Sequence, residues 1–455
     1  MRKRRKNLLG LLLCISGVSL AGIDSKKAHL SNEWYPSDPQ KLKKKLYELV
    51  TEAEKLYGAQ VSGVRALIVP HAGLRYSGSL AAGCFRLLDA KKVRRIILLA
   101  PSHHLPFKGI IVPSYSSYRL HSGVIPLDAK MIQELKKFGN PFTMVAQTKK
   151  DPHYKEHALE IELPLIQKYT PRAKIVPLIV GTLDPEQMHQ AAQVLKKYLD
   201  KETVVVVSSD FTHYGPRFNN LPFKNDALAL LRIRALDNGL LQPIFNRSLP
   251  NFLQKVTEGE ATICGKNPLS LLLALFDEGL CKQEVPYLIG YDTSRTKGTD
   301  EKNSVSYVGL AFGKPHLGPL PLLTAYEKRS LVELAERVMA NNFTHAVQDD
   351  LLYPIITPSL QQPAHLFLSC KTSNPVGCKV IERRNDASCS LYVAVMEQAQ
   401  AVCMPQSGAS AVLTYADLGD TAIQISVIAK KTHGLTRNKK VLVAESRGNT
   451  YICLA

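Results

Sequence analysis

Several familiar catalytic signatures are missing from this sequence of 455 residues. Its nine cysteines contain no CxxC pair, so zinc ribbons and thioredoxin-like redox sites lose their usual sequence support. No G-x-S-x-G elbow, Walker loop or G-x-G-x-x-G fingerprint occurs either. Those motifs are typical of serine hydrolases, nucleotide triphosphatases and Rossmann dehydrogenases, and their absence counts against all three classes.

The overall composition departs little from that of a globular protein. Hydrophobic residues make up 45% and charged residues 21%, which argues against wholesale disorder and against a multispanning membrane protein. The formal net charge is +19, but lysine and arginine are spread along the whole chain instead of being interleaved with aromatics in one stripe. The sequence therefore indicates no nucleic-acid partner, and its length predicts two or three domains.

The first segment differs from the rest of the chain. Five basic residues at 2–6 precede an apolar run at 8–20, and Ser19 and Ala21 supply small residues around a cleavage point. This pattern predicts a signal peptide over residues 1–21, cleaved after Ala21, and an exported protein, periplasmic or extracellular. The apolar run is shorter than the roughly 20 residues of a spanning helix, so we expect no permanent membrane span after cleavage.

Residues 26–313 alternate between the patterns of buried strands and helices. Apolar, β-branched runs predict strands at 65–69, 95–99, 174–180, 203–207 and 304–312. Helical periodicity fills the gaps at 39–57, 79–88, 128–137, 159–169, 185–198, 225–237 and 268–276. This alternation predicts an α/β fold in which a largely parallel sheet is flanked by helices.

A second, smaller domain is predicted after a linker rich in proline and glycine at residues 314–322. Thr324 and Glu327 form a capping-box pattern at a helix start, and alternating runs follow the helix. We expect a smaller C-terminal α+β domain over residues 323–455. Some of its cysteines could pair in an oxidising compartment, although their spacing leaves the connectivity open. They are Cys370, Cys378, Cys389, Cys403 and Cys453.

Polar residues follow three of the predicted strands at the point where each strand ends. His71 comes after the first strand, His103 and His104 after the second, and Asp210 and His213 after the fourth. In open parallel sheets ligands bind beyond the carboxyl ends of the strands, so these clusters are expected to meet. Two imidazoles with a thiolate or carboxylate, and positions left open, form the ligand set of non-haem iron, copper or catalytic zinc.

Plainer roles for the same residues stay open. A single histidine at a strand end is more often a hydrogen-bonded turn residue than a ligand. Cys264, just ahead of the helix at 268–276, offers a thiolate, but taken by itself it would be a small buried hydrophobe. Glu160 and Glu162, which form a polar patch with His157, either face solvent at a helix start or lie in the pocket.

The motifs at these strand ends resemble those of the Memo family, also described as component B of the AmmeMemoRadiSam system. The matching stretches are VPHAG at 69–73, APSHH at 100–104, EHALEIELP at 156–164, SSDFTHYG at 208–215, TICG at 262–265 and SVSY at 304–307. They follow the family's order and spacing over residues 29–313, within a Memo-like domain at 26–313. The resemblance implies a fold similar to that of class III extradiol dioxygenases.

The resemblance also implies the roles of individual residues. His71, His103 and Cys264 correspond to the family's metal-binding positions, and His213 and Asp210 line the same pocket. We expect His213 to act as acid or base and Asp210 to orient it. A carboxylate stands at the position of Cys264 in the dioxygenases, and a soft thiolate suits iron or copper better than zinc. Further residues expected in the pocket are Trp34, His104, His157 and Glu160.

The tail from about residue 322 loosely resembles the AMMECR domain, which is often encoded with or fused to Memo proteins. Val376 stands where that family has arginine, so this domain is expected to be degenerate. Two functions stay open for the chain: a metal-dependent redox enzyme, or a non-catalytic metal-handling or peptide-binding protein that uses the same pocket. The expected partners are a small-molecule or peptide ligand and, functionally, a radical SAM protein.

Overall fold

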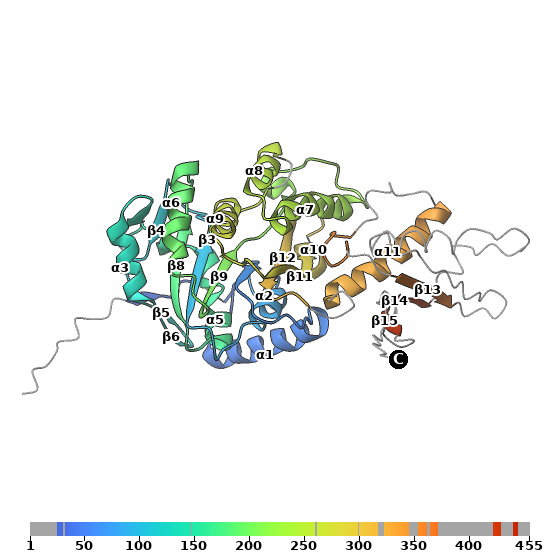
Figure 1. Ribbon diagram of the computed structural model, residues 1–455, viewed down its shortest axis with the longest axis horizontal. Helices are drawn as coiled ribbons and strands as arrows, with labels where there is room; N and C mark the ends of the chain where they lie inside the picture. The colour runs from blue at the N-terminus through green and yellow to red at the C-terminus, as the bar shows by residue number, and fades with distance from the viewer. Residues whose placement is uncertain are drawn as a thin grey trace, which may run out of the picture.

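The computed structural model describes residues 25–30, 32–146, 148–259, 262–298, 300–316, 323–344, 354–361, 365–371, 422–428 and 440–444. Among them, one large sheet forms the centre of the larger domain, with helices on both of its faces (Figure 1). The predicted α/β class is therefore confirmed. No helix in this part of the chain combines the length and the apolar character needed to cross a membrane.

The large sheet has four parallel strands at its centre. Its strands are β2 (Ala66–Val69), β3 (Arg95–Ala100), β4 (Ile110–Val112), β7 (Phe142–Met144), β8 (Lys174–Val180), β9 (Thr203–Ser208), β10 (His213–Tyr214), β11 (Val285–Thr293) and β12 (Ser304–Gly313). The parallel centre runs in the order β2, β9, β3, β8, and antiparallel neighbours, β12 and β4, extend it on its two sides. The sheet predicted to be largely parallel is parallel at its centre, and antiparallel strands at its two sides make the sheet as a whole mixed.

Helices cover the sheet on two faces. They are α1 (Pro39–Leu56), α2 (Gly78–Phe85), α3 (Ala129–Phe138), α4 (His157–Glu160), α5 (Leu163–Tyr169), α6 (Pro185–Lys196), α7 (Ala229–Phe245), α8 (Leu249–Glu258), α9 (Lys266–Asp277) and α10 (Ser294–Lys297), with 3₁₀ turns η1 (Pro152–Tyr154) and η2 (Pro216–Phe218). Figure 1 shows α1, α2 and α5 along one face and α6 and α9 along the other. The β2–β9–β3–β8 centre is buried on both faces because these layers enclose it.

One predicted helix is two helices in the structure. The helix predicted at 159–169 is divided into α4 and α5, with Pro164 in the first turn of α5. A proline deeper in a continuous helix would remove a hydrogen bond and clash with the carbonyl four residues earlier. Because the helix breaks after Glu160, the side chains of Glu160 and Glu162 point in different directions, toward Tyr35 and Ser208.

Strand β11 was missed by the sequence reading, although it pairs along most of β12. Its sequence contains Pro286 and Gly290, both of which weaken a strand pattern, and the register shifts at the glycine. A smaller sheet was missed as well. It consists of β1 (Ser25–Lys27), β5 (Ser117–Leu120) and β6 (Gly123–Pro126), with β1 and β5 parallel.

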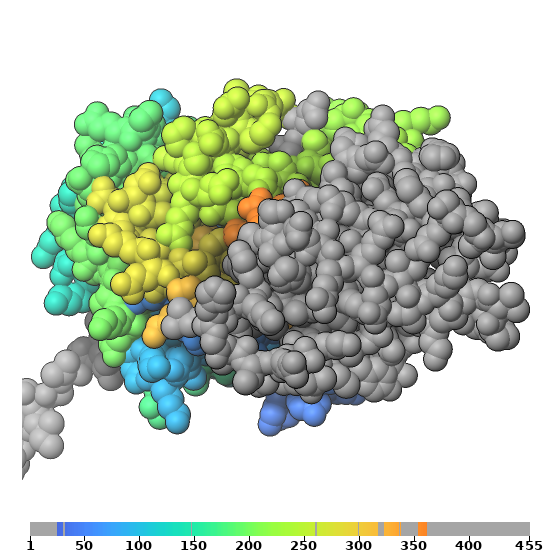
Figure 2. All heavy atoms as spheres, turned by 45° about the vertical axis from the view of Figure 1, so that its right-hand side comes forward, coloured from blue at the N-terminus to red at the C-terminus, as the bar shows by residue number. Residues whose placement is uncertain are grey.

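The C-terminal region contributes α11 (Ala325–Thr344) and an antiparallel sheet of β13 (His365–Lys371), β14 (Ala422–Ile428) and β15 (Lys440–Ala444). The predicted capping box is confirmed: Glu327 N–H donates to Thr324 Oγ1 and Thr324 N–H donates to Glu327 Oε2. The segment 354–361, orange in Figure 2, lies against α7, where Asn238 Oδ1 accepts the N–H of Ile356. The predicted leader, the Val376 motif and any cysteine pairing lie outside the described residues.

Candidate metal centre

His71 lies in the turn after β2 and is fixed at both its backbone and its ring. Its N–H donates to Asp210 Oδ1 at 2.8 Å, and its ring Nδ1 is 2.9 Å from Ser208 Oγ at the end of β9. That hydroxyl donates to Glu162 Oε1 at 3.0 Å. With the Ser208 proton directed to Glu162, Oγ accepts the Nδ1–H of His71, and Nε2 carries no proton and faces Cys264 Sγ at 3.2 Å.

His103, which follows β3 on the other side of β9, is anchored by a carboxylate directly. Its N–H donates to Glu156 Oε2 at 2.8 Å, and its Nδ1 lies 2.8 Å from Oε1 of the same residue. Burial acts to raise the pKa of Glu156, but the hydrogen bond and charge of His103 and the charge of His157 outweigh burial and lower it. An ionised Glu156 keeps the proton of His103 on Nδ1, so Nε2 again remains free.

A third imidazole completes the cluster. Possible ligand atoms of His71, His103 and His157 all lie within 4.8 Å of one another, and the ring centroids of His103 and His157 are 4.2 Å apart. Burial and the neighbouring imidazoles lower the pKa of His157 to about 4 and that of His71 well below its usual range. Both rings are therefore neutral near pH 7 and can donate a lone pair to a metal.

Cys264 lies beside this cluster. Its Sγ is 3.2 Å from His71 Nε2, and the N–H of Asp210 points to Sγ at 3.2 Å. Burial and the nearby Asp210 raise the pKa of this thiol. A Cβ on Gly265 would lie only 2.1 Å from Ser209 Oγ, so glycine is what allows the cysteine loop to approach the end of β9. The group within 4.8 Å has His157 as its third member, where the sequence pointed to Cys264.

Asp210 and His213 do not form the pair that was predicted. The Asp210 carboxylate turns to the neighbouring strand end and accepts the N–H of His71, while Nδ1 of His213 lies 2.8 Å from the carbonyl oxygen of Phe211. Burial raises the pKa of Asp210 to about 7, opposed by the N–H groups of His71 and Ala72. The expectation that Asp210 orients His213 is therefore wrong: a backbone carbonyl does so, and Asp210 orients the turn of His71.

Comparison with known proteins matches the family model described as "Memo-like protein" to residues 26–311. The chain belongs to this family. Protein MEMO1 of Danio rerio is 31% identical over 257 residues, covering 54% of this chain and 83% of that protein, and the human protein is 31% identical over 262 residues, covering 56% and 84%. The memo-1 homolog of Caenorhabditis elegans is 27% identical over 304 residues, covering 65% and 85%.

A solved structure of an uncharacterized protein from Escherichia coli K12 aligns at a TM-score of 0.35 with 15% identity, covering 55% of this chain and all of that one. That likeness is too weak to bear on the site. The Memo-like match, in contrast, covers every one of the residues that form the cluster.

The remaining predicted pocket residues of the Memo-like domain lie at different distances from the clustered imidazoles. The ring of Trp34 lies 4.7 Å from that of His157, whereas His104 is exposed and its ring is 6.3 Å from His157. Glu160 and Glu162 are both buried, which rules out the alternative in which they face solvent. Glu162 supports Ser208 behind His71, and the Glu160 carboxylate contacts the N-terminal segment instead of the imidazoles.

The outer support of the imidazoles was missed by the sequence reading. Glu156 was seen only as part of a family motif, and Ser208 only as the end of a strand. A signal for Ser208 existed, because it is a polar residue that closes an otherwise apolar, fully buried strand. Burial of Glu162 raises its pKa well above the usual range, and only the Ser208 hydroxyl opposes this.

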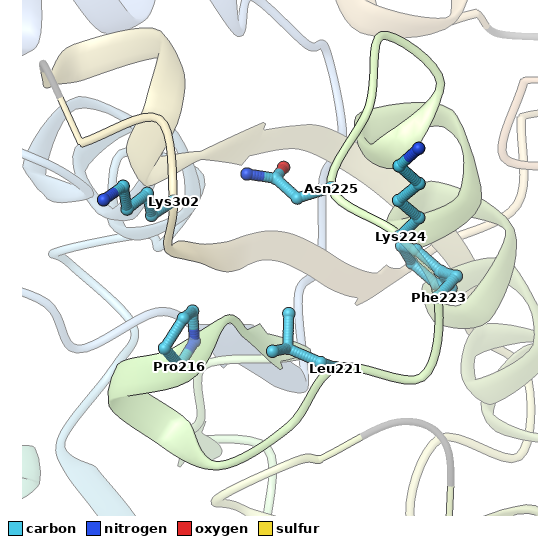
Figure 3. Close-up of a pocket in the computed structure, with 6 residues that line it drawn as sticks. All are labelled: Pro216, Leu221, Phe223, Lys224, Asn225 and Lys302. Carbon is cyan, nitrogen blue, oxygen red and sulfur yellow. The ribbon is translucent and has the colours of Figure 1, made fainter.

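A separate hollow lies close to β10, the short strand that carries His213. Its volume is about 590 Å³, and its lining residues are Pro216, Leu221, Phe223, Lys224, Asn225 and Lys302 (Figure 3). The chain after β10 is tied back to His213 through Asn220, whose Nδ2 donates to the His213 carbonyl at 2.8 Å. This hollow contains none of the clustered imidazoles, so it is distinct from the candidate metal centre of the Memo-like domain.

Proposed function

We propose that this Memo-like protein binds iron or copper through His71, His103 and Cys264, with His157 as an additional imidazole, and acts as a metal-dependent redox enzyme. One observation carries the proposal. The Nδ1 atoms of His71 and His103 are both hydrogen-bonded, to Ser208 Oγ and to Glu156 Oε1, so their Nε2 atoms are left for an ion. Outer support of this kind orients metal-binding histidines and fixes their tautomers.

The residues around the proposed site have separable tasks. The Cys264 thiol loses its proton when it becomes a ligand, because a thiolate is the ligating form. His213 offers Nε2 as an acid or base, since its Nδ1 is committed to the Phe211 carbonyl. When bound, iron or copper would supply one-electron redox chemistry to a small molecule at an open position.

The glutamates near the cluster favour redox chemistry over hydrolysis. In hydrolysis by a zinc-bound water a glutamate commonly serves as the general base, and the nearby glutamates are committed elsewhere. Glu156 holds His103, Glu160 holds the N-terminal segment and Glu162 accepts from Ser208. The pair of a thiol and an imidazole suits iron and copper as well as zinc, so the choice of a redox metal depends on the lack of a free glutamate base.

Metal content tests the first part of this proposal. Purified wild-type protein, His71→Ala and the surface control His189→Ala are loaded with iron or copper and analysed by mass spectrometry; His189 is exposed and lies on α6. We expect about one bound ion per chain for the wild type and the control. In His71→Ala the amount of bound metal should fall clearly below that, because one ligand has been removed. Full loading of His71→Ala would contradict the proposal.

The second candidate is a metal-handling or peptide-binding protein that uses the same pocket without turnover. The observation that favours it is that the two glutamates behind the cluster, Glu156 and Glu162, are already hydrogen-bonded to His103 and Ser208, so neither is left to act as a base. Oxygen consumption by the loaded protein, with a supplied reductant, distinguishes the two. Consumption that depends on His213 supports the enzyme, and its absence in a fully loaded protein supports the binding role.

Three further features of the proposal depend on the sequence resemblance. We infer that residues 1–21 direct export, that the region 323–455 derives from an AMMECR domain, and that the protein works alongside a radical SAM protein. Fractionation of cells that carry the full-length chain tests the first: recovery in the cytoplasm with an intact leader would contradict export.

A further inference from the structure

Residues 25–30 and 32–35, here together called the N-terminal strap, lie along the larger domain and reach the metal cluster. At its start, β1 pairs with β5, and Lys26 Nζ donates to the Tyr154 carbonyl at 3.2 Å. At its end, the Trp34 carbonyl accepts the N–H of Leu74 at 2.9 Å. The strap therefore connects a peripheral sheet with the turn that follows His71.

One buried carboxylate gathers the middle of the strap. Glu160 accepts the N–H of Leu30 at 2.9 Å and the Tyr35 hydroxyl at 2.8 Å, and its Oε2 is 2.6 Å from Nδ1 of His29. Burial acts to raise the pKa of Glu160, but the hydrogen bond and charge of His29 and the backbone donors outweigh burial and lower it. The carboxylate is thus ionised near neutral pH, and hydrogen bonds to an ionised acceptor are strong.

The strap also contacts two of the clustered histidines or their turns. The Trp34 ring packs on His157 at 4.7 Å between centroids. The backbone of the strap runs close to Gly73, two residues after His71. A Cβ added to Gly73 would lie 3.3 Å from the carbonyl oxygen of Glu33. Trp34 is therefore a wall of the candidate site that comes from outside the strand ends.

We infer that Glu160 is a positioning residue that fastens the strap, so that Trp34 covers His157 and limits access to the metal centre. Releasing the strap uncovers His157 without removing any donor from the cluster. The claim about access rests on the proposed function, whereas the claim about strap position does not. The position of the strap therefore sets the rate at which ions and ligands exchange with the site, and it does not change the number of ions bound per chain.

Trp34 provides the test, because it is the only tryptophan in the chain. In metal-free protein, Glu160→Gln should raise the accessibility of Trp34 to acrylamide, since loss of hydrogen bonds to a charged group raises an open population by on the order of 10-fold to 100-fold. His29→Ala, which alters the strap from its partly exposed side, should give a smaller increase. Glu160→Asp should restore part of the protection, and His189→Ala should leave it unchanged.

Metal exchange provides the second readout. In loaded protein, Glu160→Gln should speed transfer of the metal to a strong chelator by about tenfold while the ions bound per chain stay as in the wild type. Unchanged Trp34 accessibility in both Glu160→Gln and His29→Ala would overturn the strap inference, whatever the metal results. Raised accessibility in a protein that binds no metal would keep the strap inference and overturn the proposed function instead.

Discussion

The two walls of the candidate metal centre are held in different ways. On the strand-end wall, His71 and His103 follow β2 and β3, the two parallel strands that flank β9, and each ring has a buried glutamate behind it. On the strap wall, Trp34 reaches the same cluster from the N-terminal segment, which gathers on Glu160. The donors are thus preorganised by the core of the sheet, and the covering ring is attached from outside it.

This difference separates affinity from access. Changes behind the strand-end wall disturb the orientation of the donors and should weaken metal binding. Changes in the strap leave the donors in place and should alter rates of exchange more than affinity. A strap variant that weakens metal affinity, or a variant behind the strand ends that leaves it unchanged, would contradict this separation.

Acidity should have the largest effect on metal affinity. Burial and Asp210 raise the pKa of the Cys264 thiol, so the metal-free protein keeps this proton and must release it on binding. Affinity should therefore rise with pH, by roughly tenfold per unit or about 100-fold from pH ~6 to pH ~8. Burial lowers the pKa of His71 and His157, so neither ring adds a proton to be displaced over this range.

Competition against a chelator at several pH values measures this slope, and Cys264→Ser should flatten it. The same steep slope in Cys264→Ser would show that the thiol is not the group that loses the proton. Such a result would remove Cys264 from the proposed ligands and leave a metal site made of imidazoles alone.

The support of His103 should matter next. Glu156→Gln keeps the size of the side chain but removes the charge that accepts both the N–H and Nδ1 of His103. Loss of an outer partner of a metal-binding histidine typically costs about 10-fold to 100-fold in affinity. Glu278→Gln, at a site that contacts Lys196 on α6, serves as the matched control and should bind metal as the wild type does.

Ser208→Ala should have a smaller effect on the other imidazole. It removes the hydroxyl that links His71 Nδ1 to Glu162, but the turn of His71 stays fixed by Asp210. We expect affinity to fall by up to about tenfold, the lower end for an outer partner. Calorimetric titration measures the fall, and a loss larger than that in Glu156→Gln would reverse the proposed order of support.

Trp34→Phe should have the smallest effect on affinity. Phenylalanine keeps an aromatic ring against His157 and leaves all donors of the cluster unchanged. Equilibrium metal affinity should stay within about twofold of the wild type, because an aromatic pair contributes little beyond its contact area. A loss comparable with that of Glu156→Gln would mean that the strap is part of the binding wall, and the contrast between the walls would fail.

Part of this arrangement follows from the sequence because it depends on regular geometry. Parallel strands place their carboxyl ends at one edge of a sheet, so His71 and His103 could be brought together from strand patterns and order. The capping box at Thr324 and Glu327 was likewise predictable, since it depends on residues three positions apart.

The remainder depends on short irregular segments that carry no periodic signal. Glu160 and Glu162 lie on either side of the break between α4 and α5, so one turns to the strap and the other to Ser208. His157 enters the cluster from the single turn of α4, and no strand or helix period indicates where so short an element points. The direction of Asp210 was mispredicted because a backbone carbonyl had already taken Nδ1 of His213.

Anomalous scattering from a crystal of the protein loaded with copper or iron tests the central claim most directly. The account predicts one strong peak at bonding distance from His71 Nε2, His103 Nε2 and Cys264 Sγ, with Nδ1 of His71 still on Ser208 and Nδ1 of His103 still on Glu156. A fully loaded crystal whose peak lies away from these two imidazoles would contradict it.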